Sequence, residues 1–135
     1  MRDKKAIYNS KFLSIFLLAP NAYEIAWTKD TRSITLEEYN VEIDNIVDFC
    51  KNNEVHRILF NFQDLILDMI LFENVRPFVY LKEICKNQFL ERGVMILPKD
   101  LLTHIVLKRF LMEGGLKKVK IFVNYNDALN WIVNE

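Results

Sequence analysis

The feature that most constrains the fold is an alternation of strand-like and helix-like segments along the chain. Four short apolar runs, among them VHRILFNF and KVKIFV, are each followed by a segment in which apolar side chains recur at helical spacing. Strands that alternate with helices in this way form βαβ units with right-handed crossovers, which build a largely parallel sheet covered by helices. The pattern therefore predicts an α/β fold, with a single layered domain over residues 1–135.

A β-hairpin precedes the first helix in the predicted order. The runs FLSIFLL and AYEIAWT flank Pro20-Asn21, a dipeptide typical of turns. The hairpin adds an antiparallel strand, so we expect the order ββαβαβαβα in a sheet of four to five strands. The MRDKK start and the apolar run after it loosely resemble a signal peptide. Polar residues 8–11 separate the charges from that run, so we assign residues 12–18 to a strand.

Capping residues mark the expected helix boundaries. Thr35 and Glu38 form a capping-box pattern at the start of the first helix, and Ile34 with Tyr39 is spaced as a hydrophobic staple. The other boundaries are assigned to Pro77 and a left-handed Gly93, to Asp100 and Gly114-Gly115, and to Asn124. The helical faces that point inward are expected to contain Ile43, Val47, Phe89, Ile105 and Leu129, whereas Glu42 is expected to face outward.

Composition excludes several classes of function. The chain has 18 basic and 18 acidic residues and no net charge, so it lacks the attraction to nucleic acid that a basic domain has. No stretch reaches the roughly 18 apolar residues that a membrane-spanning helix needs. Cys50 and Cys85 lie at apolar positions of helical patterns, which is typical of buried thiols in a reducing compartment. We therefore expect a cytoplasmic protein that binds no nucleic acid and has no membrane span.

Charge is unevenly divided along the chain. Residues 1–75 carry 8 basic and 12 acidic side chains (net −4), whereas residues 76–135 carry 10 basic and 6 acidic side chains (net +4). An anion-facing surface in the later half is one interpretation, and lysines that solvate helix ends and strand edges are the simpler one. The cations concerned are Lys108, Arg109, Lys117, Lys118 and Lys120.

Several local motifs resemble those of the STAS-like (SpoIIAA-like) superfamily, and in particular small stand-alone bacterial members. The matching stretches are Trp27 at the end of the second strand, the helix start SITLEEY, the strand ILFNF, Pro77, RGVMILPKDLL and the ending NYNDALNWI. The resemblance implies a non-catalytic role in which the domain binds partner proteins. Some such domains are switched by phosphorylation of a Ser or Thr after the third strand. Residues 59–81 contain neither, so that switch is not expected here, and PFVYLK also lacks the Gln and Trp that close relatives carry after the Pro.

Sequence signals for catalysis or metal binding are weak. His56 and His104 have no second metal ligand at a recognised spacing, and no Gly-rich phosphate-binding motif occurs. Cys85 with His104 is a conceivable nucleophile and base, and Asp64 with Asp68 a conceivable acid and base. A buried thiol, and carboxylates that keep an apolar segment soluble, are the simpler interpretations. We therefore expect no enzymatic activity, no cofactor and no metal site.

The 65–72 segment, LILDMILF, follows the strand ILFNF where α/β folds usually place a functional loop. All of its residues except Asp68 are apolar, so even a helical turn must leave some apolar side chains in water. Exposed apolar patches usually mark interaction sites. We therefore predict a protein-interaction or regulatory module that contacts a partner or its own copy, as a homodimer, through Leu67, Ile70, Leu71 and Phe72. The alternative is a small hydrophobic-ligand binding protein with residues 65–72 at the pocket mouth.

Overall fold

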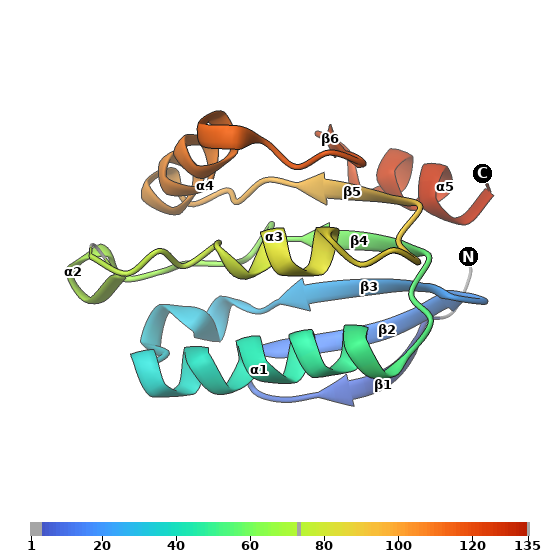
Figure 1. The fold of residues 1–135 in the computed structure, drawn as a ribbon. Coiled ribbons are helices and arrows are strands. Elements are labelled where there is room, and N and C mark those ends of the chain that lie inside the picture. The colour runs from blue at the N-terminus through green and yellow to red at the C-terminus, as the bar shows by residue number, and fades with distance from the viewer. Residues whose placement is uncertain (1–3, 73, 135) are drawn as a thin grey trace.

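A computed structural model describes residues 4–72 and 74–134 of the chain. Within those residues one six-stranded sheet runs in the order β1-β2-β3-β4-β5-β6 (Figure 1). The strands are β1 (Lys5–Asn9), β2 (Leu13–Ala19), β3 (Ala22–Trp27), β4 (Arg57–Asn61), β5 (Arg92–Ile96) and β6 (Val119–Phe122). The helices are α1 (Leu36–Asn52), α2 (Met69–Phe72), α3 (Tyr80–Cys85), α4 (Leu101–Gly114) and α5 (Tyr125–Asn134), with a 3-10 helix η1 (Lys29–Ser33).

The sheet is mixed, with an antiparallel part and a parallel part. β1, β2 and β3 pair antiparallel, so the expected hairpin around Pro20-Asn21 is confirmed as β2 and β3. β3 to β6 pair parallel, and β4, α3 and β5 form the βαβ unit expected over residues 55–97. The α/β prediction is therefore confirmed, but the expected count of four to five strands is wrong. The added strand is β1, an edge strand with four of its five residues exposed, which leaves no hydrophobic alternation to detect.

The helices divide between the two faces of the sheet. Buried residues of α1, α3 and α4 share one apolar cluster with Ile15, Ile25 and Phe60 of the sheet. Ala128 and Ile132 of α5 form a second cluster with Leu59 and other side chains of the opposite face. Figure 1 shows α1 and α3 in front of the strands and α5 apart from them. Successive crossovers that advance in one direction place their helices on one face, which leaves α5 alone on the other.

The predicted caps account for most helix boundaries. Thr35 Oγ1 accepts from the Glu38 backbone while Glu38 accepts from the Thr35 backbone, so the capping box begins α1 as expected. The Asp100 carboxylate accepts from the Thr103 backbone at the start of α4, and Gly115 ends that helix with a φ of 65°. Asn124 Oδ1 accepts from the backbone of Asp127 and caps α5.

The predicted second helix is wrong in length and in its cap. α3 ends at Cys85, because Asn87 turns the chain by donating to the Cys50 carbonyl oxygen and accepting from the Phe89 backbone. Gly93 lies inside β5 and has no positive φ. Its role there is close packing, since an added Cβ would approach Val119 Cγ2 to 3.3 Å.

Three of the expected inward side chains are confirmed and three orientations are wrong. Ile43, Val47 and Leu129 pack against the two apolar clusters. Phe89 and Ile105 are exposed, because Phe89 lies beyond the end of α3 and Ile105 faces away from the sheet on α4. Glu42 is buried instead of exposed, because β1 brings the hydroxyl groups of Tyr8 and Ser10 to its carboxylate.

Candidate functional site

The first half of the 65–72 segment is fixed by hydrogen bonds from its backbone. Phe62 donates to the Ile96 carbonyl oxygen at 3.1 Å, which continues the β4–β5 pairing by one residue. The backbone N–H of Ile66 donates to Thr31 Oγ1 at 2.9 Å, and that of Leu67 donates to Thr103 Oγ1 at 3.0 Å. Both threonines are fully buried. The chain is therefore held between η1 on one side and α4 on the other.

Aromatic side chains fix the second half of the segment. The ring of Tyr39 on α1 stacks on Trp27 with centroids 5.4 Å apart and meets Phe72 edge to face at 5.1 Å. Its hydroxyl donates to the Pro77 carbonyl oxygen at 2.6 Å, and burial raises the pKa of this hydroxyl well above its usual value. The tyrosine therefore stays neutral and donates at any physiological pH.

This anchoring separates the four residues predicted to contact a partner. Leu67 and Phe72 have 2% and 1% of their surface exposed, so they are core residues and do not reach a partner in this structure. Ile70 is 87% exposed and Leu71 is 46% exposed. The short helix α2 explains the difference, because successive residues of a helical turn point in different directions. Contact with a partner through Ile70 and Leu71 stays a prediction. Leu67 and Phe72 anchor the segment in the core.

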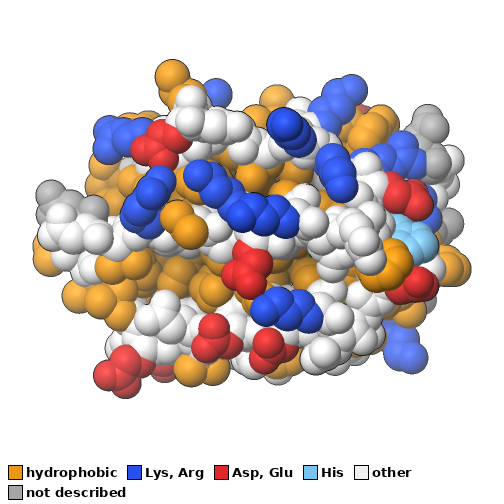
Figure 2. All heavy atoms as spheres, in the orientation of Figure 1, with side chains coloured by type: hydrophobic (Ala, Val, Ile, Leu, Met, Phe, Trp, Pro, Cys, Tyr) orange, Lys and Arg blue, Asp and Glu red, His pale blue; other side chains and the backbone are white. Residues whose placement is uncertain are grey.

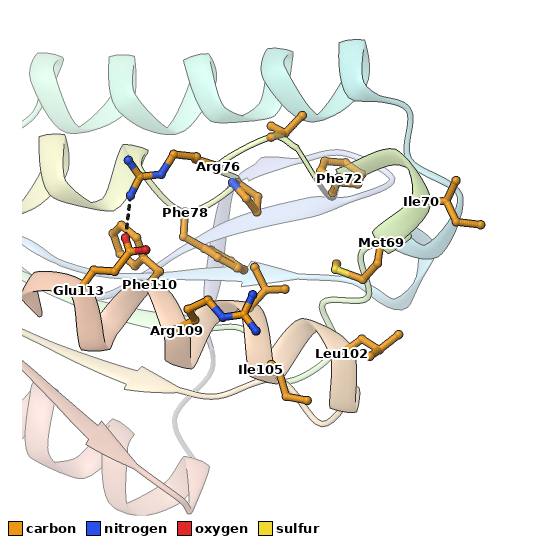
Figure 3. A pocket seen from close by; sticks show the side chains of 13 residues that line it. Met69, Ile70, Phe72, Arg76, Phe78, Leu102, Ile105, Arg109, Phe110 and Glu113 are labelled. Atoms are coloured by element: carbon orange, nitrogen blue, oxygen red, sulfur yellow. Dashed lines mark hydrogen bonds and ion pairs between the residues drawn. The ribbon is translucent and has the colours of Figure 1, made fainter.

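An apolar groove of about 580 Å³ opens beside Ile70 and Phe72, between residues 69–78 and α4 (Figure 3). Figure 3 shows Met69 and Phe78 pointing into the space from one wall, and Leu102, Ile105 and Arg109 along the helix that forms the other. The groove lies beyond the carboxyl ends of β4 and β5, the edge at which α/β folds commonly bind ligands. Its lining is Met69, Ile70, Phe72, Val75, Arg76, Pro77, Phe78, Leu102, Ile105, Val106, Arg109, Phe110 and Glu113.

Three charged residues stand at the groove. Arg76 and Glu113 form an ion pair of 2.7 Å that joins the two walls. The Arg109 side chain makes no hydrogen bond or ion pair with any residue that the structure describes, although it also lines the groove. The ammonium of Lys82 lies 5.5 Å from the ring centroid of Phe110, another lining residue. The groove therefore combines an apolar body with one unpaired cation.

The outward surface of α4 extends the apolar area. Leu101, Leu102, Ile105 and Met112 are all exposed, and Met112 is 84% exposed. A second, shallower hollow beside Met112 shares Ile105, Arg109 and Glu113 with the groove. Figure 2 shows Lys and Arg side chains gathered over the upper half of the molecule and acidic side chains along its lower edge, where α1 lies. The charge asymmetry along the sequence therefore also appears on this face of the molecule, with basic side chains above and acidic ones below.

The residues considered for catalysis include a partly buried thiol and a carboxylate that accepts a backbone hydrogen bond. Burial raises the pKa of the Cys50 thiol to about 12 and of the Cys85 thiol to about 11, the latter in spite of nearby Lys118. Both thiols are therefore protonated and weakly nucleophilic at neutral pH. Asp68 accepts from the backbone of Ile70 and begins α2, and no hydrogen bond or ion pair joins it to Asp64 within the described chain.

The two histidines lie apart. His104 lies on α4, where its Nδ1 is 3.2 Å from the carbonyl oxygen of Pro98. His56 lies at the opposite end of the sheet, where its Nδ1 is 3.7 Å from a carboxylate oxygen of Glu91. Among residues 4–72 and 74–134, no three His, Cys, Asp or Glu side chains converge in a way that could hold a metal ion. The described helices include none with the length and apolar character needed to cross a membrane.

Sequence reasoning found one wall of the groove and missed the other. The run LLTHIVLKRFLM of α4 is apolar around more of its circumference than one buried stripe requires, and this was the available signal. Arg76, Arg109 and Glu113 had no recognisable motif, because they meet only when residues 69–78 fold against α4.

No protein-family model, no curated protein and no solved structure matches the chain.

Proposed function

We propose that the protein is a non-catalytic interaction module of the STAS-like type, and that the apolar groove between residues 69–78 and α4 is its contact surface. The observation that carries the proposal is the exposure of Ile70 and Leu71 on a segment that buried threonines and Tyr39 hold in place. A fixed, exposed apolar surface next to a groove is the usual form of a protein contact site.

Energetics support a contact at this surface. A large apolar side chain left in water forgoes roughly 1.5 to 3 kcal/mol of burial free energy. Ile70, Leu71, Leu102 and Met112 are all in this position on neighbouring elements. The simplest partner is a second copy of the chain that meets the same surface about a two-fold axis, as most soluble oligomers do.

Control by phosphorylation is not part of this proposal. The stretch from Leu59 to Leu81 has no Ser or Thr, and its one tyrosine, Tyr80, is buried. A kinase could reach the Tyr80 hydroxyl only after local unfolding. The module is therefore expected to bind its partner without a phosphorylation switch in the stretch that follows β4.

Analytical ultracentrifugation tests the self-contact. Wild type is expected to dimerise at micromolar concentration, and Ile70→Asp to raise the dimer dissociation constant at least tenfold, because a carboxylate would be buried in the interface. Val123→Asp is the matched control, since Val123 is also highly exposed but lines none of the cavities around the groove. A wild type that remains monomeric at high micromolar concentration contradicts the homodimer.

A second candidate function is binding of a small hydrophobic ligand. The groove volume of about 580 Å³ is typical of ligand sites, and Arg109 supplies an unpaired cation for an anionic head group. Native mass spectrometry of protein purified from its own cells distinguishes the two candidates. A constant added mass that Ile105→Trp removes favours the ligand, whereas a doubled protein mass favours the self-contact.

A further inference from the structure

A polar site, separate from the apolar groove, surrounds Glu24 on the face of the sheet that α5 covers. Glu24 projects from β3 and has no exposed surface. Its cross-strand neighbour on β2 is Phe16, so the two side chains stand on the same face of the sheet. Phe16 and Tyr125 pack on the apolar cluster beneath α5, which shares no residue with the groove. The surroundings of Glu24 are therefore independent of the proposed contact surface.

The Glu24 carboxylate is held by donors from separate elements. Tyr125, the first residue of α5, donates its hydroxyl hydrogen to Oε1 at 2.6 Å. Asn61 at the end of β4 donates from Nδ2 to Oε2 at 3.0 Å. Burial, together with the nearby carboxylate, raises the pKa of the Tyr125 hydroxyl, so this group remains a neutral donor. The carboxylate is thereby fixed in one orientation by β3, β4 and α5.

A cation occupies the space in front of this carboxylate. The ammonium of Lys4 donates to Glu24 Oε1 at 3.1 Å and to the Tyr125 hydroxyl oxygen at 3.0 Å. It also lies 4.4 Å from the ring centroid of Phe16 and 5.1 Å from that of Tyr125. A carboxylate and two aromatic faces around one ammonium are the elements with which proteins recognise alkylammonium groups. We call Glu24, Phe16, Tyr125 and Asn61 the ammonium cage.

The cage is built into the strands and α5, whereas its occupant lies outside the sheet, before the first strand. The four cage residues belong to β2, β3, β4 and α5, while Lys4 precedes β1 by one residue. The Lys4 side chain remains 34% exposed, against 0% for Glu24. Lys4 can therefore leave the cage without the loss of a strand pair. Its departure would expose a fixed carboxylate between two rings.

We propose that the ammonium cage is a binding site for a primary alkylammonium group of another molecule, and that Lys4 fills it in the free protein. The ligand chemistry is an unbranched alkyl chain ending in a primary ammonium, as found in a free amine or in a lysine side chain. A buried carboxylate is costly to remove from water, and well-packed apolar residues in its place are often at least as stable. A requirement to bind a cation accounts for its presence.

The test uses the Lys4→Ala protein with n-butylammonium as the probe and n-butanol as the neutral analogue of the same length. Isothermal titration calorimetry is expected to show that Lys4→Ala binds n-butylammonium with millimolar affinity, at least tenfold more tightly than wild type, in which Lys4 competes. n-Butanol is expected to give no binding. Equal binding of the ammonium by both proteins, or none by Lys4→Ala up to about 10 mM, overturns the proposal.

Two further variants show that the cage residues carry the binding. Glu24→Gln in the Lys4→Ala background removes the charge and is expected to weaken n-butylammonium at least tenfold, and Phe16→Leu removes a ring at similar size and is expected to weaken it severalfold. An unchanged affinity in the Glu24→Gln protein contradicts the site. Nα-acetyl-lysine methylamide identifies the source, since tighter binding than n-butylammonium indicates a partner's lysine and weaker binding a free amine.

The same probe also tests the proposal if the Lys4→Ala protein fails to fold. If Lys4→Ala does not fold in buffer, n-butylammonium is expected to restore the folded circular dichroism signal, because a ligand that binds only the folded protein stabilises it by mass action. Failure of the amine to restore the signal overturns the proposal.

Discussion

The Tyr39 hydroxyl donates to the carbonyl oxygen of Pro77 through a buried hydrogen bond of 2.6 Å. The bond joins α1 to the stretch that enters α3, across 38 residues of sequence. It also fixes one wall of the groove, because Pro77 and Phe78 both line that wall. Tyr39, a buried residue of α1, therefore helps to fix the position of this wall.

Tyr39→Phe tests this link. The substitution leaves the Pro77 carbonyl oxygen buried without a donor, and we expect the free energy of unfolding to fall by about 1 to 3 kcal/mol. Urea denaturation measures the change. Tyr23→Phe is the matched control, because the Tyr23 ring packs on Phe49 while its hydroxyl makes no hydrogen bond within the described chain. Its change should stay within about 0.5 kcal/mol, and equal losses in both variants would contradict a specific role for the Tyr39 bond.

Thr103→Val tests the second tie of the segment. Thr103 Oγ1 accepts from the Leu67 backbone and donates to Asp100, and all three groups are part of the contact between the segment and α4. Valine has a similar shape but leaves the Leu67 N–H unsatisfied, so we expect a loss of about 1 to 3 kcal/mol. Hydrogen exchange should show faster exchange at the Leu67 amide. Thr103→Ser retains the hydroxyl and should retain the protection, and an unchanged Leu67 amide in Thr103→Val would argue against the tie.

Leu67→Ala and Ile70→Ala separate core from surface within the segment. Leu67 is buried, so its truncation leaves a cavity and should cost about 2 to 5 kcal/mol. Ile70 projects into water, and its truncation should change the free energy of unfolding by less than about 0.5 kcal/mol. Thermal or urea unfolding of the two proteins gives the comparison. Similar costs at both positions would mean that the segment packs differently from the structure.

Local sequence signals correctly predicted most of the helix caps and the hairpin turn, which depend only on residues close together in the sequence. The capping box of Thr35 and Glu38, the Asp100 cap and the Pro20-Asn21 turn each need only three or four residues, and all are present. The alternation of strands and helices predicted the parallel pairing of β3 to β6, because a helix between two strands returns the chain to the same end of the sheet. Short-range chemistry was therefore sufficient for the order of strands β2 to β6 and of helices α1, α3, α4 and α5, but η1 and α2 were not in the predicted order.

Long-range contacts decided what the sequence pattern left open. Glu42 lies on the polar side of the α1 pattern, yet it is buried because Tyr8 and Ser10 approach it from 34 and 32 residues away. Ile105 fits the apolar spacing of α4, yet Leu107 and Phe110 face the core instead. A helix whose apolar side chains extend beyond one stripe does not reveal which side meets the sheet.

The candidate site was also predicted only in part: the sequence indicated an exposed apolar segment but not which of its residues are exposed. The exposure of an apolar face on residues 65–72 followed from composition, since one helical turn cannot bury seven apolar side chains. The identity of the buried residues depended on Thr31, Thr103 and Tyr39, which are distant in sequence. The ammonium cage depended on four elements and had no sequence signal at all.

Alkaline pH should weaken the fold through its buried thiols and phenols. Burial raises the pKa of Cys50 to about 12, against about 8.5 for an exposed thiol. Between these values the unfolded chain loses a proton that the folded protein keeps, so stability is retained below about pH 8 and falls as pH rises. Burial also raises the pKa of Tyr39 and Tyr80, and these hydroxyls add to the fall at higher pH.

The Cys50→Ala variant isolates the thiol contribution. Each group that keeps its proton only in the folded state lowers the free energy of unfolding by about 1.4 kcal/mol per pH unit. Urea denaturation from pH 7 to pH 10 should therefore show a steeper decline for wild type than for Cys50→Ala, and the difference should reach about 2 kcal/mol at pH 10 relative to pH 7. At pH 7 the variant is expected to be the less stable protein, because the buried sulfur packs in the core beneath α1. Parallel declines with pH would show that the Cys50 thiol ionises as readily in the folded protein as in the unfolded chain.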